Sequence, residues 1–283
     1  MIVITAATGQ LGRLVVDGLL AQLPADQIAV AVREPAKAAD LAAKGIEVRH
    51  GDYTDPDSLK AAFQGADKVL LISSSEVGQR LSQHKNAIEA AQAAGVDHLV
   101  YTSLLHADTS TLNLAPEHLG TEELLATSGL TTTILRNGWY TENHEQPIKQ
   151  AVESGVIIGS AGEGRLHNAS RKDYAAAAVA VLTGTGHEGK VYELAGDTGW
   201  TLAELAAEVG KVSGREVRYD DLTPEAHQET LVGFGVPAEV AELYVGWDQG
   251  IKTGQLVEIG GDLSKLIGRP ATPLAEVVAE ILA

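Results

Sequence analysis

The sequence predicts an α/β fold in which a doubly wound parallel sheet is joined to a smaller, mostly helical C-terminal lobe. Three observations support this fold class. Short β-branched runs alternate with longer helical patterns up to about residue 135, a glycine-containing turn follows the first run, and the alternation becomes irregular after residue 136. Such alternation is typical of βαβ units, whose parallel strands are covered by helices on both faces.

Six short runs, most of them rich in Val, Ile and Thr, are the expected strands. They are Ile2–Thr5, Ile28–Val32, Glu47–His50, Val69–Ile72, Leu99–Thr102 and Thr131–Leu135. Apolar residues recur at helical spacing between them, over residues 11–23, 36–43, 57–63, 79–94 and 117–128. Right-handed connections between these elements predict the strand order 3-2-1-4-5-6.

The second half of the chain has helical patterns at 174–182, 202–212, 238–244 and 274–282, interrupted by one clear strand at 191–194. We therefore expect one domain over residues 1–136. The remaining residues, 137–283, are expected to form mainly a separate lobe, with part of 137–200 returning to the sheet.

Composition narrows the classes of function and partner. The 38 acidic and 21 basic residues give a formal charge of -17, which opposes binding to nucleic acid. The absence of cysteine excludes disulfides and thiolate chemistry, and we expect no metal site. The chain starts on a strand, with no signal peptide pattern and no apolar run long enough for a membrane span. We expect a soluble, cytoplasmic protein.

The turn from Thr5 to Gly12 connects the first strand to the first helix, and this context makes it a candidate dinucleotide site. Gly9 lets the backbone approach a pyrophosphate, and Gly12 permits close packing of the helix on the strand. A tight turn without a ligand is the alternative. Ala6 stands where the usual pattern has its first glycine, and we expect its φ to stay negative. The predicted cofactor contacts here are Ala6, Ala7, Thr8, Gly9, Gln10 and Leu11.

The ends of the next strands carry further candidates. Arg33 ends the second strand, where arginine favours the 2′-phosphate of NADP and an acid favours NAD. A solvated surface arginine is the alternative. Asp52 can accept a hydrogen bond from the adenine amine, although a plain turn explains it equally well. Ser73, Ser74 and Ser75 offer donors toward a ribose, or form a solvated loop. The cofactor prediction is NADP(H).

The residues 135–143 leave the sixth strand at its carboxyl end and are expected to border the nicotinamide. Asn137 and the backbone can hold the carboxamide. Trp139, Tyr140 and Asn143 can line a flat pocket for an aromatic substrate, although the two rings equally well pack the two lobes together. Arg171 is expected to reach this cleft from the other lobe.

No Tyr-x-x-x-Lys pair, the usual acid of short-chain dehydrogenases, is present. His118 is a weak catalytic candidate, because a lone histidine in a helix is more often structural. The expected substrate is therefore one that needs little help with protonation. A quinone fits, because its reduction gives a phenolate-like product with a proton affinity near that of tyrosine.

The sequence resembles the NmrA-like branch of the atypical short-chain dehydrogenases, and within it the bacterial NADPH-dependent quinone oxidoreductases of type 2. The resemblance runs nearly end to end and rests on residues 7–12, 32–37, 71–80, 101–110, 136–140 and 186–197. It implies a Rossmann domain that binds NADPH along the first turn, Arg33, residues 73–75 and residues 137–142, which add Gly138, Thr141 and Glu142 to the predicted contacts. It also implies that His118 stands where some relatives keep a catalytic lysine.

These observations predict hydride transfer from NADPH to a quinone or another flat aromatic acceptor. Two alternatives remain open at this point. One is a reductase of triphenylmethane dyes, and the other is a non-catalytic NADP(H) sensor that binds a protein partner. A homodimer is the candidate assembly.

Overall fold

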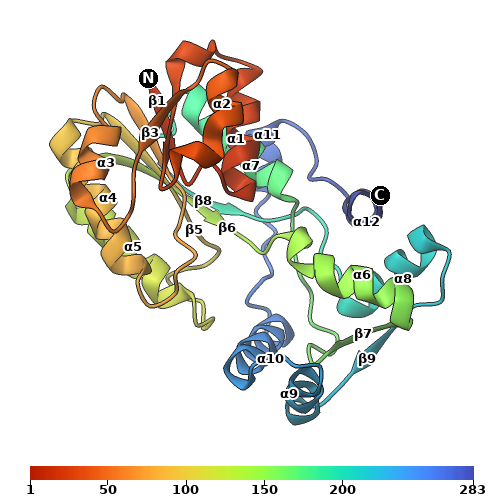
Figure 1. The fold of residues 1–283 in the computed structure, drawn as a ribbon. Helices are drawn as coiled ribbons and strands as arrows, with labels where there is room; N and C mark the ends of the chain where they lie inside the picture. The colour runs from red at the N-terminus through yellow and green to blue at the C-terminus, as the bar shows by residue number, and fades with distance from the viewer.

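The computed structural model describes all 283 residues, and its main feature is a sheet of seven parallel strands (Figure 1). The strands lie in the order β3-β2-β1-β4-β5-β6-β8, which confirms the predicted order of the first six. Their bounds are β1 Ile2–Thr5, β2 Ile28–Val32, β3 Glu47–His50, β4 Lys68–Leu71, β5 His98–Leu104, β6 Thr131–Asn137 and β8 Val191–Leu194. The last strand returns from the second half of the chain and pairs in parallel with β6.

Helices cover both faces of this sheet, because alternate side chains of each strand point to opposite faces. Ile2 and Ile4 of β1 belong to one apolar cluster, which includes residues of α1 (Gln10–Leu20) and α7 (Arg171–Thr183). Val3 belongs to a second cluster on the other face. That face is covered by α3 (Pro56–Ala62), α4 (Arg80–Ala94) and α5 (Ala115–Thr127). Burial on both faces explains why the central strands β1 and β2 read as continuous apolar runs, whereas the edge strand β3 is exposed at both ends and is mostly polar.

Most of the remaining elements lie beyond the carboxyl ends of the strands (Figure 1), and several of them share a third apolar cluster. They include α6 (Glu145–Ser154), α8 (Leu202–Ser213) and α12 (Leu274–Leu282), and a parallel pair formed by β7 (Val156–Gly159) and β9 (Arg218–Asp221). The helices α9 (Pro224–Gly233) and α10 (Ala238–Lys252) lie at the far end of this region, and α11 (Asp262–Ile267) returns to pack against α7.

Several of these elements differ from the sequence prediction. The predicted helix at 36–43 begins as the 3-10 turn η2 (Pro35–Ala38) and continues as α2 (Ala39–Ala43). The elements α6, β7, β9, α9 and α11 and the 3-10 turns η1 (Ala25–Gln27) and η3 (Thr141–His144) were not predicted, and α10 extends well beyond residue 244. None of the helices combines the length and the apolar composition needed to cross a bilayer.

Candidate functional site

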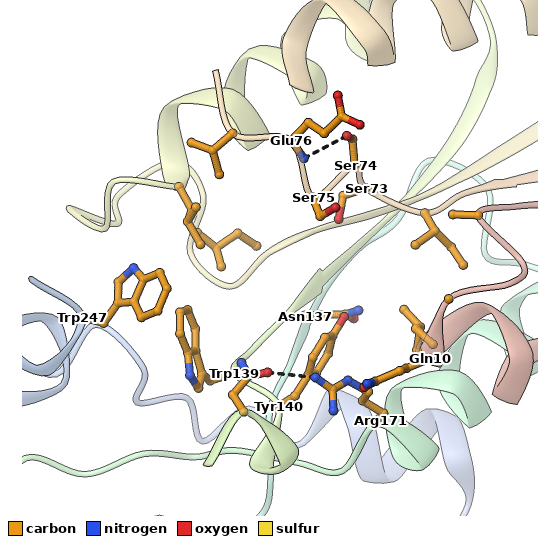
Figure 2. Close-up of a pocket in the computed structure, with 18 of the residues that line it drawn as sticks. Gln10, Ser73, Ser74, Ser75, Glu76, Asn137, Trp139, Tyr140, Arg171 and Trp247 are labelled. Carbon is orange, nitrogen blue, oxygen red and sulfur yellow. Dashed lines mark hydrogen bonds between the residues drawn. The ribbon is translucent and has the colours of Figure 1, made fainter. Parts of the chain in front are cut away.

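One large cavity opens at the carboxyl ends of the strands, with a volume of about 1720 Å³. It extends from the turn after β1 to helices α9 and α10. Figure 2 shows the loop of Ser73, Ser74 and Ser75 on one side, facing Gln10, Asn137, Trp139, Tyr140 and Arg171. The predicted residues that line it are Ala6, Thr8, Gly9, Gln10, Leu11, Arg33, Asp52, Ser73, Ser74, Ser75, His118, Asn137, Gly138, Trp139, Tyr140, Asn143 and Arg171, whereas Ala7, Thr141 and Glu142 do not line it.

The turn after β1 departs from the expectation at Ala6. Its φ is +49°, so the expectation that φ stays negative is wrong. An L-residue in this left-handed region costs roughly 1–2 kcal/mol. Two contacts hold the conformation: the carbonyl of Ala6 accepts a 2.9 Å hydrogen bond from the N–H of Gly9, and it lies directly against Gly12. The surrounding turn therefore imposes a glycine-like backbone on an alanine.

The same turn leaves a cradle for an anion. A Cβ at Gly12 would lie 2.6 Å from the carbonyl oxygen of Ala6 and 2.7 Å from the Cα of Ala7, so only glycine permits this approach. Gly9 caps helix α1 and has no side chain to bind the N–H groups of the first turn. These N–H groups and the positive end of the helix remain for a ligand, which fits a pyrophosphate.

Arg33 stands at the end of β2, with a side chain that is 64% exposed and an ion pair at 3.2 Å to Glu76. Glu76 follows the serine loop, so this pair joins the β2 and β4 loops. An exposed pair of this kind contributes little to stability, which leaves the guanidinium available to an incoming phosphate. Asp52 also lines the cavity, and its Oδ1 accepts 2.8 Å hydrogen bonds from the N–H and the hydroxyl of Thr54. One of its oxygens thus serves the turn.

Polar side chains of helix α4 hold the serine loop that follows β4. The N–H of Ser74 donates to Nε2 of His84 at 2.9 Å, and Nε of Arg80 donates to the carbonyl of Ser74 at 2.7 Å. The hydroxyl of Ser74 donates to Gln83, and Ser74 is buried. Ser75 is exposed and Ser73 is half-buried. Of the three hydroxyls, that of Ser74 is therefore committed to the loop itself.

His118 belongs to a buried polar network beneath this loop. Its Nδ1 lies 2.8 Å from the hydroxyl of the fully buried Tyr101. Burial, aided by the charge of Arg80, lowers the pKa of His118 to about 3. The imidazole is neutral near pH 7, so it has no proton to give as an imidazolium. This environment favours a structural role over general acid catalysis.

The start of the segment after β6 is closely fitted to its surroundings. A Cβ at Gly138 would lie 2.9 Å from the hydroxyl of Tyr174 and 3.1 Å from the carbonyl oxygen of Leu194. Asn137 is buried, and its Oδ1 has no hydrogen-bond partner in the protein. An orphaned buried acceptor at a cavity wall requires an explanation. A donor on a bound ligand, such as a carboxamide, supplies one.

Tyr140 and Arg171 form the next part of this wall. The guanidinium carbon of Arg171 lies 4.9 Å from the centroid of the Tyr140 ring, and Nη2 of Arg171 donates to Oδ1 of Asn143 at 2.9 Å. The carboxylate of Glu142 accepts from the N–H of Arg171 at 2.9 and 3.1 Å and so caps helix α7. Thr141 is buried. Glu142 and Thr141 therefore shape the wall from behind.

An aromatic ladder continues the cavity toward the second region, and we define it as Trp139, Trp247 and Tyr244. The ring centroids of Trp139 and Trp247 are 5.2 Å apart in an edge-to-face arrangement, as are those of Trp247 and Tyr244. Trp247 stands beside Trp139 in Figure 2. Sequence reasoning missed Trp247 and Tyr244. Their spacing of three along a helix, which places them on one face, was the available signal.

This site and fold define a dinucleotide-binding protein, and comparison with known proteins agrees. A family of NAD(P)H-binding proteins matches residues 6–185. The chain belongs to this family. An NmrA-like family domain-containing oxidoreductase of Aspergillus flavus is 28% identical over 99% of this chain and 94% of its own length. The cofactor is therefore NAD(P)H.

More similar proteins place the chain near particular reductases. Quinone oxidoreductase 2 of Escherichia coli is 54% identical over 99% of this chain and 98% of its own length. The crystal structure of that NADPH-dependent enzyme complexed with NADPH superposes with a TM-score of 0.97, covering both chains completely at 53% identity. The triphenylmethane reductase of Citrobacter sp. complexed with NADP(H) has a TM-score of 0.95, covering 99% of this chain and 100% of that one at 41% identity.

Proposed function

We propose that this protein is an NADPH-dependent quinone oxidoreductase. The observation that carries the proposal is one continuous cavity in which a dinucleotide cradle leads into an aromatic ladder. This arrangement comes with 54% identity to a quinone oxidoreductase along the whole chain. A flat acceptor can lie against Trp139 beside the nicotinamide end of the cradle.

Bound NADPH supplies the hydride, and the side chains position the reactants. We assign the pyrophosphate to the N–H groups of the turn at Gly9 and the first turn of α1. We assign the 2′-phosphate to the side chain of Arg33 and the nicotinamide carboxamide to Asn137. The remaining predicted contacts, including Asp52, Ser73, Ser75 and Arg171, border the cofactor. We assign supporting roles to Ala7, Thr141, Glu142 and the hydroxyl of Ser74. Ala7 and Thr141 are buried, the carboxylate of Glu142 accepts from the N–H of Arg171, and the hydroxyl of Ser74 donates to Gln83.

Since burial holds His118 neutral, it offers the acceptor no imidazolium proton. On this proposal the reduced acceptor takes its proton from water or leaves as an anion. A quinone tolerates this, because its first reduced form is phenolate-like. A simple ketone does not, since it would become a strongly basic alkoxide. The site thus favours a quinone over an ordinary carbonyl substrate.

The direct test is steady-state turnover with NADPH and 1,4-benzoquinone. We expect reduction well above the uncatalysed background, and turnover at background would refute the proposal. Tight NADPH binding without turnover of any acceptor, together with different affinities for the oxidised and reduced cofactor, would favour the sensor alternative.

A second candidate activity is reduction of triphenylmethane dyes. The similarity to a triphenylmethane reductase at 41% identity and the net charge of -17, which attracts cations, favour it. The ratio of kcat/KM for malachite green and 1,4-benzoquinone, measured on one preparation, separates the two activities.

We also propose a Rossmann domain over residues 1–136 and a mainly substrate-binding lobe over 137–283. A cytoplasmic location, a homodimer and the absence of nucleic-acid partners stay predictions from the sequence.

A further inference from the structure

Three polar side chains from three elements meet at the far end of the cavity. Ser160 follows β7, His227 lies on α9 and Asp248 lies on α10. The N–H of Ser160 donates to Oδ2 of Asp248 at 2.6 Å, and the hydroxyl of Ser160 lies 3.1 Å from Nδ1 of His227. The same Nδ1 is 3.4 Å from Oδ2 of Asp248. We call these three residues the buried clasp.

The buried clasp has the composition of a hydrolytic triad but not its geometry. In a triad the nucleophile and the carboxylate bind different nitrogens of the imidazole, so that a proton can pass through the ring. Here Ser160 and Asp248 both face Nδ1 of His227. Ser160 is also only 1% exposed, so it cannot reach a substrate. The cluster therefore requires another role.

Its position indicates that role. Asp248 directly follows Trp247 on α10, and the next residue, Gln249, donates from Nε2 to the carbonyl of Ser160 at 2.9 Å. A Cβ at Gly159 would lie 2.8 Å from Oδ2 of Asp248, so α10 approaches the end of β7 closely. These contacts fix the rotation of α10 about its axis and its position along that axis, directly beside Trp247 of the aromatic ladder.

The carboxyl group of Asp248 sits in a water-poor site. Burial, together with the nearby charge of Asp221, raises its pKa to about 6, against the opposing hydrogen bonds from Ser160. Burial also lowers the pKa of His227. Tyr219 of β9 is the other titratable group that faces this carboxyl. Hydrogen bonds to a charged group in such surroundings are strong, so loss of the clasp should be felt by α10.

We propose that the buried clasp of Ser160, His227 and Asp248 positions Trp247 and Tyr244 against Trp139 and thereby sets the affinity for a flat aromatic acceptor. These are positioning residues, because they act through the ladder. The inference rests on the proposed reductase function and adds residues that determine acceptor binding from the second region.

The test compares Asp248→Ala, Asp248→Asn and the matched control Asp220→Ala in steady-state kinetics with 1,4-benzoquinone. Asp220 accepts from Nε and Nη2 of Arg218 on the strand β9 of the same two-stranded sheet, but it does not line the cavity. We expect Asp248→Ala to raise the KM for benzoquinone about tenfold, with kcat at saturation and the KM for NADPH within about twofold of wild type. Asp248→Asn keeps an acceptor for Ser160 and should recover most of the affinity. Asp220→Ala should leave the KM unchanged.

His227→Ala tests the same clasp from α9, and its effect should be less than additive with Asp248→Ala. An unchanged KM in Asp248→Ala, or an equal rise in Asp220→Ala, overturns the proposal. So does a failure of Asp248→Asn to recover the affinity. If Asp248→Ala does not fold, His227→Ala and Asp248→Asn carry the comparison. If the wild type does not reduce benzoquinone, the proposed function fails separately, and the dissociation constant for malachite green, read from the dye's absorbance, tests the clasp with the same variants.

Discussion

Ala6→Gly is expected to stabilise the protein, because Ala6 holds a left-handed backbone at φ +49°. The strain relieved is roughly 1–2 kcal/mol. Glycine also gives the unfolded chain greater freedom, which offsets about 0.4–1 kcal/mol of that gain. The net increase in the free energy of unfolding is therefore about 1 kcal/mol, which raises Tm by about 2 °C for a chain of this size. Calorimetry on the cofactor-free protein measures it.

The matched control is Ala21→Gly. Ala21 is exposed and has φ -72° at the end of α1, so the same change relieves no strain there. It should lower the free energy of unfolding by about 0.5–1 kcal/mol. The dissociation constant for NADPH should stay within about twofold in Ala6→Gly, since the backbone that binds the pyrophosphate is retained. If Ala6→Gly destabilises the protein as Ala21→Gly does, the turn carries no strain and the reasoning is wrong.

Three further predictions concern the cofactor half of the molecule. Arg33→Ala should raise the dissociation constant for NADPH about tenfold or more and that for NADH less than about twofold, and an equal loss for both would mean that Arg33 does not contact the 2′-phosphate. Gly12→Ala places a methyl 2.6 Å from a backbone carbonyl, so it should destabilise the fold by about 1–3 kcal/mol and weaken NADPH binding in a titration; wild-type affinity would contradict this. Burial lowers the pKa of both His84 and His118 to about 3. The stability they contribute is present above about pH 6.5, the unfolded value, and is lost as pH falls toward 3, by about 1.4 kcal/mol per unit for each. Urea unfolding of wild type and His118→Gln between about pH 6 and pH 4 measures this, and equal slopes would refute it.

The central strands of the sheet are predicted well because they are buried on both faces. Runs such as Ile28–Val32 have no polar position to confuse the pattern, and the observed bounds of this strand are the predicted ones. The second region behaves differently. The strand Arg218–Asp221 consists of Arg, Tyr and two Asp and belongs to a sheet of only two strands, so it has neither an apolar run nor an alternation. Its pairing with β7 depends on tertiary packing that periodicity does not report.

The same distinction applies to the site. Most of the predicted cofactor contacts lie at strand ends, where topology alone brings Gly9, Arg33 and Ser73 to one cavity. The expectation for Ala6 rests on the intrinsic preference of alanine for negative φ, and the hydrogen bond from Gly9 outweighs that preference. Trp247 was missed because its partner in the ladder, Trp139, is remote in sequence, and only the packing of α10 against the segment after β6 joins them.

Different elements form the cofactor end and the acceptor end of the cavity, and this difference has a functional consequence. The turn at Gly9 and the side chain of Arg33 belong to elements locked into the sheet, so the cofactor site is fixed by the same contacts that form the main core. The acceptor wall is shared, since Trp139 follows β6 whereas Trp247 is carried by α10. On the proposed function, we therefore expect changes in α9 and α10 to alter acceptor binding more than NADPH binding. The same separation is consistent with a family whose members are named for reducing quinones and triphenylmethane dyes.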